Sequence, residues 1–126
     1  MKIEEEKKQL FKAKNTVYQL LKYRPRSEKE IYDKLTEKNF SKNIIDNIIS
    51  YFKDVELIND NLFTRGWISS RLTKPYGLTR IRYELKQKGI KKEIIKQEIA
   101  LLEPYIDEEN IAINLATKQK KIYTNL

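Results

Sequence analysis

The amino-acid sequence predicts an all-α protein made of tandem three-helix repeats: two complete repeats and the first helix of a third. Apolar residues recur at the spacing of amphipathic helices along most of the 126 residues. Only three glycines and three prolines interrupt this pattern. The pattern also repeats at an offset of fifty residues, as in the pairs Ile31 and Ile81, and Leu35 and Leu85. Such repeats are usually supersecondary units that bury their apolar faces against one another.

The fifty-residue offset holds in successive segments, which defines the expected domain boundaries. Pro25 corresponds to Pro75, and Val17 corresponds to Trp67. Chance seldom keeps one offset over several segments. We therefore expect an N-terminal lead with the first repeat in residues 1–57, the second repeat in residues 58–105, and part of a third in residues 106–126.

Three helices are predicted in the first repeat. The first ends near Lys22, because Pro25 pushes the residue before it out of the helical region. Ser27 caps the second helix, and Glu30, three positions on, completes a capping box. Ser41 caps the third helix. Apolar residues at helical spacing mark the inner faces of the first and third helices: Leu10, Ala13, Val17, Leu20 and Leu21 in one, and Ile44, Ile45, Ile48, Ile49, Phe52 and Val55 in the other.

Three more helices are predicted in the second repeat. The fourth spans about residues 59–73, and the fifth lies between two glycines in residues 77–90, where Gly89 suits a left-handed helix end. The sixth spans residues 92–103 and stops before Pro104. We assign Phe63 and Trp67 to the core rather than to an interface, and expect burial of these residues: Ile44, Ile48, Phe52, Trp67, Ile81, Leu85, Ile95 and Ile99.

A seventh helix is predicted from Asp107, with Ile111, Leu115 and Ala116 on its apolar face. The two helices that would complete a third repeat are absent from the sequence, and exposed apolar patches seldom stay exposed. We therefore expect residues 107–126 to fold back onto the second repeat or to pack against another copy in self-association. A frayed tail is the alternative.

The composition excludes most enzyme classes. The chain has no cysteine and no histidine, which removes disulfides, thiol nucleophiles, the commonest metal ligand and the usual general base. We expect no catalytic residues, no cofactor and no metal. The sequence contains no apolar run long enough to cross a bilayer and does not begin like a signal peptide. A soluble, cytoplasmic protein without membrane contact is expected.

Positive charge is concentrated in residues 65–92, which hold nine Lys and Arg against one acid, Glu84. The rest of the chain holds seventeen of each sign. This concentration favours an acidic partner, although a solvated basic face remains the alternative. Glu84 is expected to pair with Arg80 or Lys88 one helical turn away. The candidate residues for binding a protein partner or nucleic acid are Arg71, Lys74, Tyr76, Arg80, Arg82, Tyr83, Lys86, Lys88, Lys91 and Lys92.

Two sets of residues resemble motifs of the bacterial RecX regulatory proteins, which are built from tandem three-helix repeats. The first set is residues 26–30 followed by Leu35 and Lys38. The second is Ile58, Asp60, Phe63, Trp67, Ile68, Arg71, Gly77, Arg80, Ile81, Glu84, Leu85, Lys88, Gly89 and Ile90. The resemblance covers about residues 13–122. The sequence departs from the family pattern at Asn39, where a glycine is expected, at Thr64, where an alanine is expected, and at Gly66.

The resemblance implies a non-catalytic modulator that binds the RecA recombinase, chiefly as its filament on single-stranded DNA. It implies restraint of strand exchange, ATP hydrolysis and co-protease activity, and so an effect on DNA repair and the SOS response. In such a contact, Lys and Arg would supply attraction that salt weakens, and exposed aromatics would supply specificity. Tyr76 and Tyr83 are candidates, but ordinary packing with a surface hydroxyl explains each tyrosine alone better.

Two other functions are consistent with the sequence. One is direct binding of double-stranded DNA by a helix-turn-helix arrangement, with the fifth or sixth helix in the groove. Against it, no cluster of Asn, Gln or Arg at a helix N-terminus is placed to recognise base edges. The other is a scaffold module whose charge only aids solubility.

Overall fold

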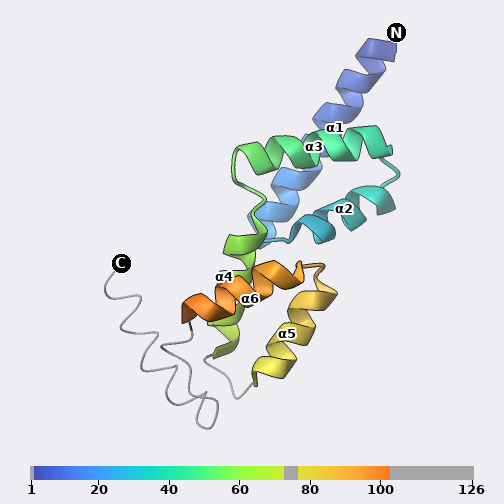
Figure 1. The fold of residues 1–126 in the computed structure, drawn as a ribbon. Coiled ribbons are helices and arrows are strands. Elements are labelled where there is room, and N and C mark those ends of the chain that lie inside the picture. Colours follow the sequence, from blue (N-terminus) through green and yellow to red (C-terminus); the bar gives the residue numbers. More distant parts are fainter. Residues whose placement is uncertain (1, 73–76, 103–126) are drawn as a thin grey trace. The chain divides into compact units, whose positions relative to one another are not determined.

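The computed structural model describes residues 2–72 and 77–102, and within these ranges it contains six α-helices and no strand. The all-α prediction is confirmed. The predicted seventh helix and its packing lie outside the described residues. The helices are α1 (Lys2–Tyr23), α2 (Glu28–Glu37), α3 (Lys42–Asp54), α4 (Asp60–Leu72), α5 (Leu78–Gln87) and α6 (Lys92–Leu102) (Figure 1).

The chain divides into two compact units, with the boundary between Asp60 and Asn61. We refer to residues 1–60 as the first unit and to residues 61–126 as the second unit. The first contains α1, α2 and α3, and the second contains nearly all of α4 together with α5 and α6.

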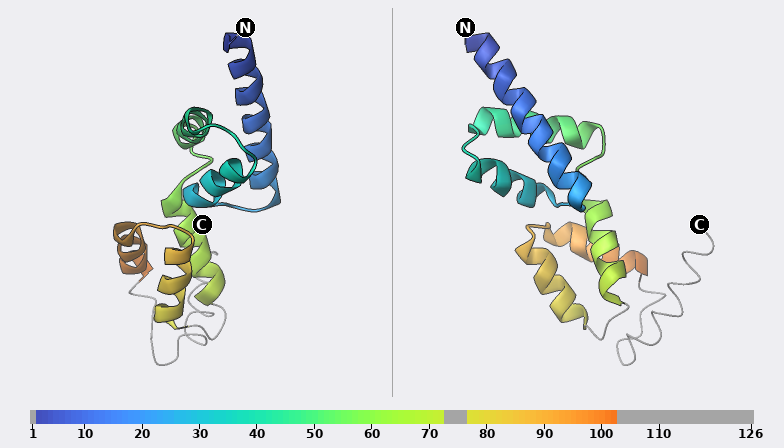
Figure 2. Two further views of the ribbon diagram at one scale, coloured as in Figure 1. Left: turned by 90° about the vertical axis from the view of Figure 1, so that its right-hand side faces the viewer. Right: turned by 180° about the vertical axis from the view of Figure 1, so that it is seen from behind.

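In the first unit, α1 and α2 both pack against α3 around one apolar cluster (Figure 2). The N-terminal part of α1 extends beyond α3, and the first buried residue of α1 is Ala13. Val55 was expected in this core but is 46% exposed, because α3 ends at Asp54 and Val55 is its C-cap. The buried cluster consists of Ala13, Val17, Ile31, Leu35, Ile44, Ile45, Ile48, Ile49, Phe52 and Ile58.

The predicted helix starts are confirmed by their hydrogen bonds. The Glu30 backbone N–H donates to Ser27 Oγ at 3.2 Å, and the Ser27 N–H donates to Glu30 Oε1 at 3.2 Å, which completes the capping box. The Ile44 N–H donates to Ser41 Oγ at 3.3 Å. Gly77, the counterpart of Ser27 in the second unit, is the N-cap of α5 but provides no side-chain hydrogen bond.

The second unit has its own core, which α4, α5 and α6 all contribute to. Trp67 was expected inside it but is only half-buried and packs at its margin. The reason is that polar groups and cations, rather than apolar side chains, surround part of the indole. The buried residues are Phe63, Ile68, Leu72, Leu78, Ile81, Leu85, Ile90, Ile95 and Ile99.

Three helices end with the same backbone motif. Asn39, Glu56 and Gly89 follow the C-caps of α2, α3 and α5, with φ of 66°, 60° and 79°. In each case the next N–H bonds a carbonyl five residues back, as in Ile90 to Leu85 at 3.1 Å. This is the Schellman motif, which favours glycine. The left-handed end predicted at Gly89 is therefore confirmed, and Asn39 adopts it where the family pattern has glycine.

Candidate functional site

The described basic residues of positions 65–92 fall into two groups. One group is engaged with acids or with the Trp67 ring: Arg65, Arg71, Arg80 and Lys88. The other is exposed, and none of its members forms an ion pair within the described part of the chain: Arg82, Lys86, Lys91 and Lys92. We call this second group the α5–α6 basic set.

The Glu84 carboxylate on α5 organises the first group. It accepts a hydrogen bond from Trp67 Nε1 at 3.2 Å and another from Arg71 Nε at 3.3 Å, both from α4. Arg80 Nε lies 3.8 Å from the other oxygen, one turn earlier on α5. The expected pair between Glu84 and Arg80 is thus present, and Glu84 also links α5 to α4.

The Trp67 ring adds cation–π contacts to the same cluster. The Arg71 guanidinium lies 4.0 Å from the ring centroid, and Lys88 Nζ lies 5.3 Å from it. Phe63 stacks on the indole with centroids 5.9 Å apart. Arg71 and Lys88, both named as candidate contacts, therefore have a role in holding the second unit together.

The charges of the α5–α6 basic set, in contrast, are not neutralised by neighbouring acids within the described residues. Arg82 and Lys86 are spaced i, i+4 on α5, where like charges repel and destabilise a helix. No acid within the described residues neutralises either of them. Tyr83, beside Arg82 in the sequence, is 63% exposed. Lys91 and Lys92 extend the set into the first turn of α6, next to a positive helix N-terminus that does not favour cations.

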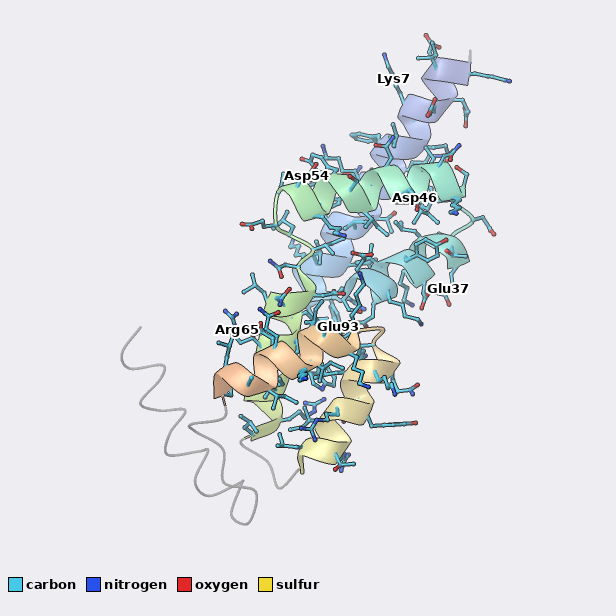
Figure 3. The ribbon with its side chains drawn as sticks, viewed as in Figure 1. Lys7, Glu37, Asp46, Asp54, Arg65 and Glu93 are labelled. Carbon is cyan, nitrogen blue, oxygen red and sulfur yellow. The ribbon has the colours of Figure 1, made fainter. Side chains whose placement is uncertain are left out.

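Sequence reasoning missed a buried polar network in the second unit. Glu98 on α6 is 2% exposed and accepts hydrogen bonds from Arg65 Nε at 2.8 Å and from Asn61 Nδ2 at 3.2 Å (Figure 3 labels Arg65). Hydrogen bonding and attraction from Glu98 raise the pKa of Arg65. A detectable signal existed, because Glu98 stands fifty positions after the buried Ile48.

Two candidate residues, Lys74 and Tyr76, lie outside the described residues. Across the residues that are described, no cluster of carboxylates is arranged to hold a metal ion. None of the described helices is long and apolar enough to span a membrane.

Models of two protein domains match this architecture. That of the first three-helix domain of RecX matches residues 13–52, and that of the second matches residues 59–98. The chain belongs to the RecX family. The first matched segment runs from the middle of α1 into α3, and the second runs from the start of α4 into α6.

Curated RecX relatives cover most of the chain. The regulatory protein RecX of Haemophilus influenzae strain PittGG is 39% identical over 108 residues, which are 85% of this chain and 70% of that protein. The regulatory protein RecX of Caldanaerobacter subterraneus is 29% identical over 114 residues, or 90% of this chain and 58% of that protein. The chain thus spans little more than half the length of this second relative. These relatives are named regulatory proteins.

Solved RecX structures share the fold. The crystal structure of RecX from Lactobacillus salivarius superposes with a TM-score of 0.75 at 25% identity, covering 94% of this chain and 77% of that one. Another crystal structure of a regulatory protein RecX gives a TM-score of 0.72 at 26% identity, covering 94% and 59%.

Proposed function

We propose that this RecX-family chain binds the RecA recombinase, chiefly as its filament on single-stranded DNA, and inhibits its activities. Those activities are strand exchange, ATP hydrolysis and co-protease activity, so the chain would modulate DNA repair and the SOS response from the cytoplasm. Family membership supports the regulatory role. The absence of histidine and cysteine from the sequence is consistent with a protein that acts by binding.

The α5–α6 basic set is the observation that carries this proposal. Arg82 and Lys86 repel each other, and Lys91 and Lys92 stand at an unfavourable helix end, so the fold gains nothing from their charges. An anionic partner removes both penalties. A nucleoprotein filament offers such partners in its phosphates and in the carboxylates of its protein.

The Glu84 cluster would support this contact without making it. Glu84 and Trp67 fix α5 against α4 through the indole hydrogen bond and the Arg71 pair. The exposed side of α5 is then presented on a rigid element, which lowers the ordering cost of binding. Tyr83 would add an aromatic contact beside the charges.

A three-way titration tests the proposal. Because Trp67 is the sole tryptophan, its fluorescence reports on the second unit directly. The chain is titrated with bare duplex, bare single strand and RecA-coated single strand at one salt concentration. The proposal expects the tightest binding to the coated strand, together with a fall in RecA ATP hydrolysis. Equal affinity for bare duplex would instead support direct double-stranded DNA binding and reject the proposal.

A further inference from the structure

A second basic stretch lies on α1, where the balanced charge count of the chain outside residues 65–92 conceals it. From Lys7 to Tyr23, α1 contains five lysines and no acid; the acids of α1 are all in its first turns, at Glu4, Glu5 and Glu6. None of the five lysines takes part in an ion pair within the described residues. Figure 3 shows Lys7 on the part of α1 that extends beyond α3.

Lysines alternate with exposed aromatic rings along one side of this helix. Phe11 is 67% exposed and Tyr18 is 42% exposed. They are spaced i, i+7, with lysines before, between and after them at intervals of three or four residues, so all five share one face. This face, which we call the α1 aromatic–lysine face, consists of Lys7, Phe11, Lys14, Tyr18 and Lys22.

One of the two rings, Tyr18, packs against the neighbouring helix α3. Tyr18 and Tyr51 both contact the buried Phe52 edge-on, and their ring centroids lie 5.0 and 5.1 Å from the Phe52 centroid. Lys14 Nζ lies 4.1 Å from the centre of the Tyr51 ring. Tyr18 is therefore anchored on one side by the core, while a substantial part of its surface remains in water.

Exposed rings flanked by lysines that form no ion pair within the described residues match the chemistry of single-stranded nucleic acid. Unpaired bases stack on aromatic side chains, and lysines follow the phosphates between them. A duplex hides its bases, so it could use only the lysines. We propose that the α1 aromatic–lysine face binds single-stranded nucleic acid by stacking bases on Phe11 and Tyr18. This site lies on the first unit and does not depend on the proposed RecA contact.

An abasic oligonucleotide separates stacking from charge. The full chain is titrated by fluorescence anisotropy with labelled oligothymidine and with an abasic strand of equal length. We expect the base-bearing strand to bind about tenfold more tightly. The double variant Phe11→Ala and Tyr18→Leu should remove that difference, whereas Tyr23→Ala, which removes an exposed ring from another side of α1, should keep it. Equal binding of the two strands by the wild-type chain would overturn the proposal.

Charge is tested with matched lysine pairs. Lys7→Gln with Lys22→Gln should weaken binding of both strands and reduce the salt dependence, because two phosphate contacts are lost. Lys2→Gln with Lys12→Gln removes equal charge from the side of α1 that faces away from these five residues and should have a smaller effect. Equal losses from the two pairs would show diffuse attraction and reject the face as a site. If Tyr18→Leu alters the circular dichroism, Phe11→Ala alone decides, because the Phe11 side chain is largely exposed.

Discussion

The indole Nε1 of Trp67 donates a hydrogen bond to Glu84 Oε1 at 3.2 Å, which joins α4 to α5 across the margin of the second core. Arg71 donates to the same oxygen at 3.3 Å and also covers the indole face. One carboxylate therefore satisfies a half-buried N–H group and orients a guanidinium. The side chain that appeared in the sequence as an isolated acid among bases is a structural centre of the unit.

Replacing Glu84 tests this role. Glu84→Ala removes the acceptor that the Trp67 N–H and Arg71 Nε share, so we expect a loss of about 1 to 2 kcal/mol in the free energy of unfolding. Glu93→Ala, at an exposed position on α6, should cost less than about 0.5 kcal/mol. Urea denaturation gives both values. A double-mutant cycle with Trp67→Phe should show coupling, and strict additivity would contradict the linkage.

The buried Glu98 makes a different prediction. Arg65→Ala leaves the Glu98 carboxylate, which is 2% exposed, with the Asn61 amide as its remaining hydrogen-bond donor within the described residues. We expect a loss of roughly 2 to 3 kcal/mol in the free energy of unfolding. This loss is smaller than that expected for breaking a fully buried ion pair, because the Arg65 side chain is half exposed. Adding Glu98→Ile, which copies Ile48 of the first unit, should restore most of that loss. A double variant no more stable than Arg65→Ala would show that the network is needed for packing.

Glycine-to-alanine changes at two positions should change the free energy of unfolding in opposite directions. At Gly89, φ is 79°, so a Cβ is strained there and Gly89→Ala should lose about 1 to 2 kcal/mol. Gly66 is inside α4, and a Cβ added to it would meet nothing within 4 Å. Gly66→Ala should therefore gain about 0.5 to 1 kcal/mol. Thermal unfolding followed by circular dichroism distinguishes them; a shift of the same sign in both variants would contradict the backbone assignment.

The ion pair between Lys53 and Glu28 should show itself at high pH. A hydrogen bond from Lys53 Nζ to Glu28 at 3.0 Å, with their attraction, raises the pKa of Lys53 above 10.5. The folded state binds this proton more tightly, so the stabilisation is complete well below pH 10.5 and is lost as pH rises through the folded pKa. The side chains of Lys53 and Glu28 are 54% and 41% exposed, which limits the effect to about 1 kcal/mol or less. Lys53→Met should be less stable than wild type at neutral pH and equally stable in strong alkali. A stability difference that persists in strong alkali would show that the ion pair with Glu28 is not its cause.

The fold was predictable because its signals are local and occur twice. Helical spacing and the fifty-residue offset located the buried pairs Ile31 with Ile81 and Leu35 with Leu85. The Ser27 capping box was also correct, since it depends on neighbours in the sequence. Trp67 was misplaced because helical spacing put it, with Phe63, on the inner stripe of the fourth helix. Spacing shows which side of a helix faces inward, but not whether polar groups cover part of a large ring there.

Of the candidate site, only the excess of basic residues in one stretch of the chain could be predicted from the sequence. Charge counting found the basic stretch, and the family resemblance named a partner for it. Neither could separate Arg71 from Arg82. Arg71 pairs with Glu84, thirteen residues further along the chain, whereas Arg82 has no ion-pair partner within the described residues. That separation depends on contacts between helices. The same averaging concealed the lysines of α1, because acids in the rest of the chain offset them in the count.

The central claim is that the exposed cations of α5 contact the RecA filament, and charge reversal with a matched control tests it most directly. Arg82→Glu with Lys86→Glu is compared with Lys38→Glu and Lys42→Glu on the first unit, which changes the net charge equally. Arg80 is left intact because it pairs with Glu84. Affinity for RecA-coated single strands is measured over a range of salt. We expect the α5 pair to weaken binding strongly and flatten its salt dependence while the control pair binds nearly as the wild type does. Equal affinity of the two variants would contradict the claim.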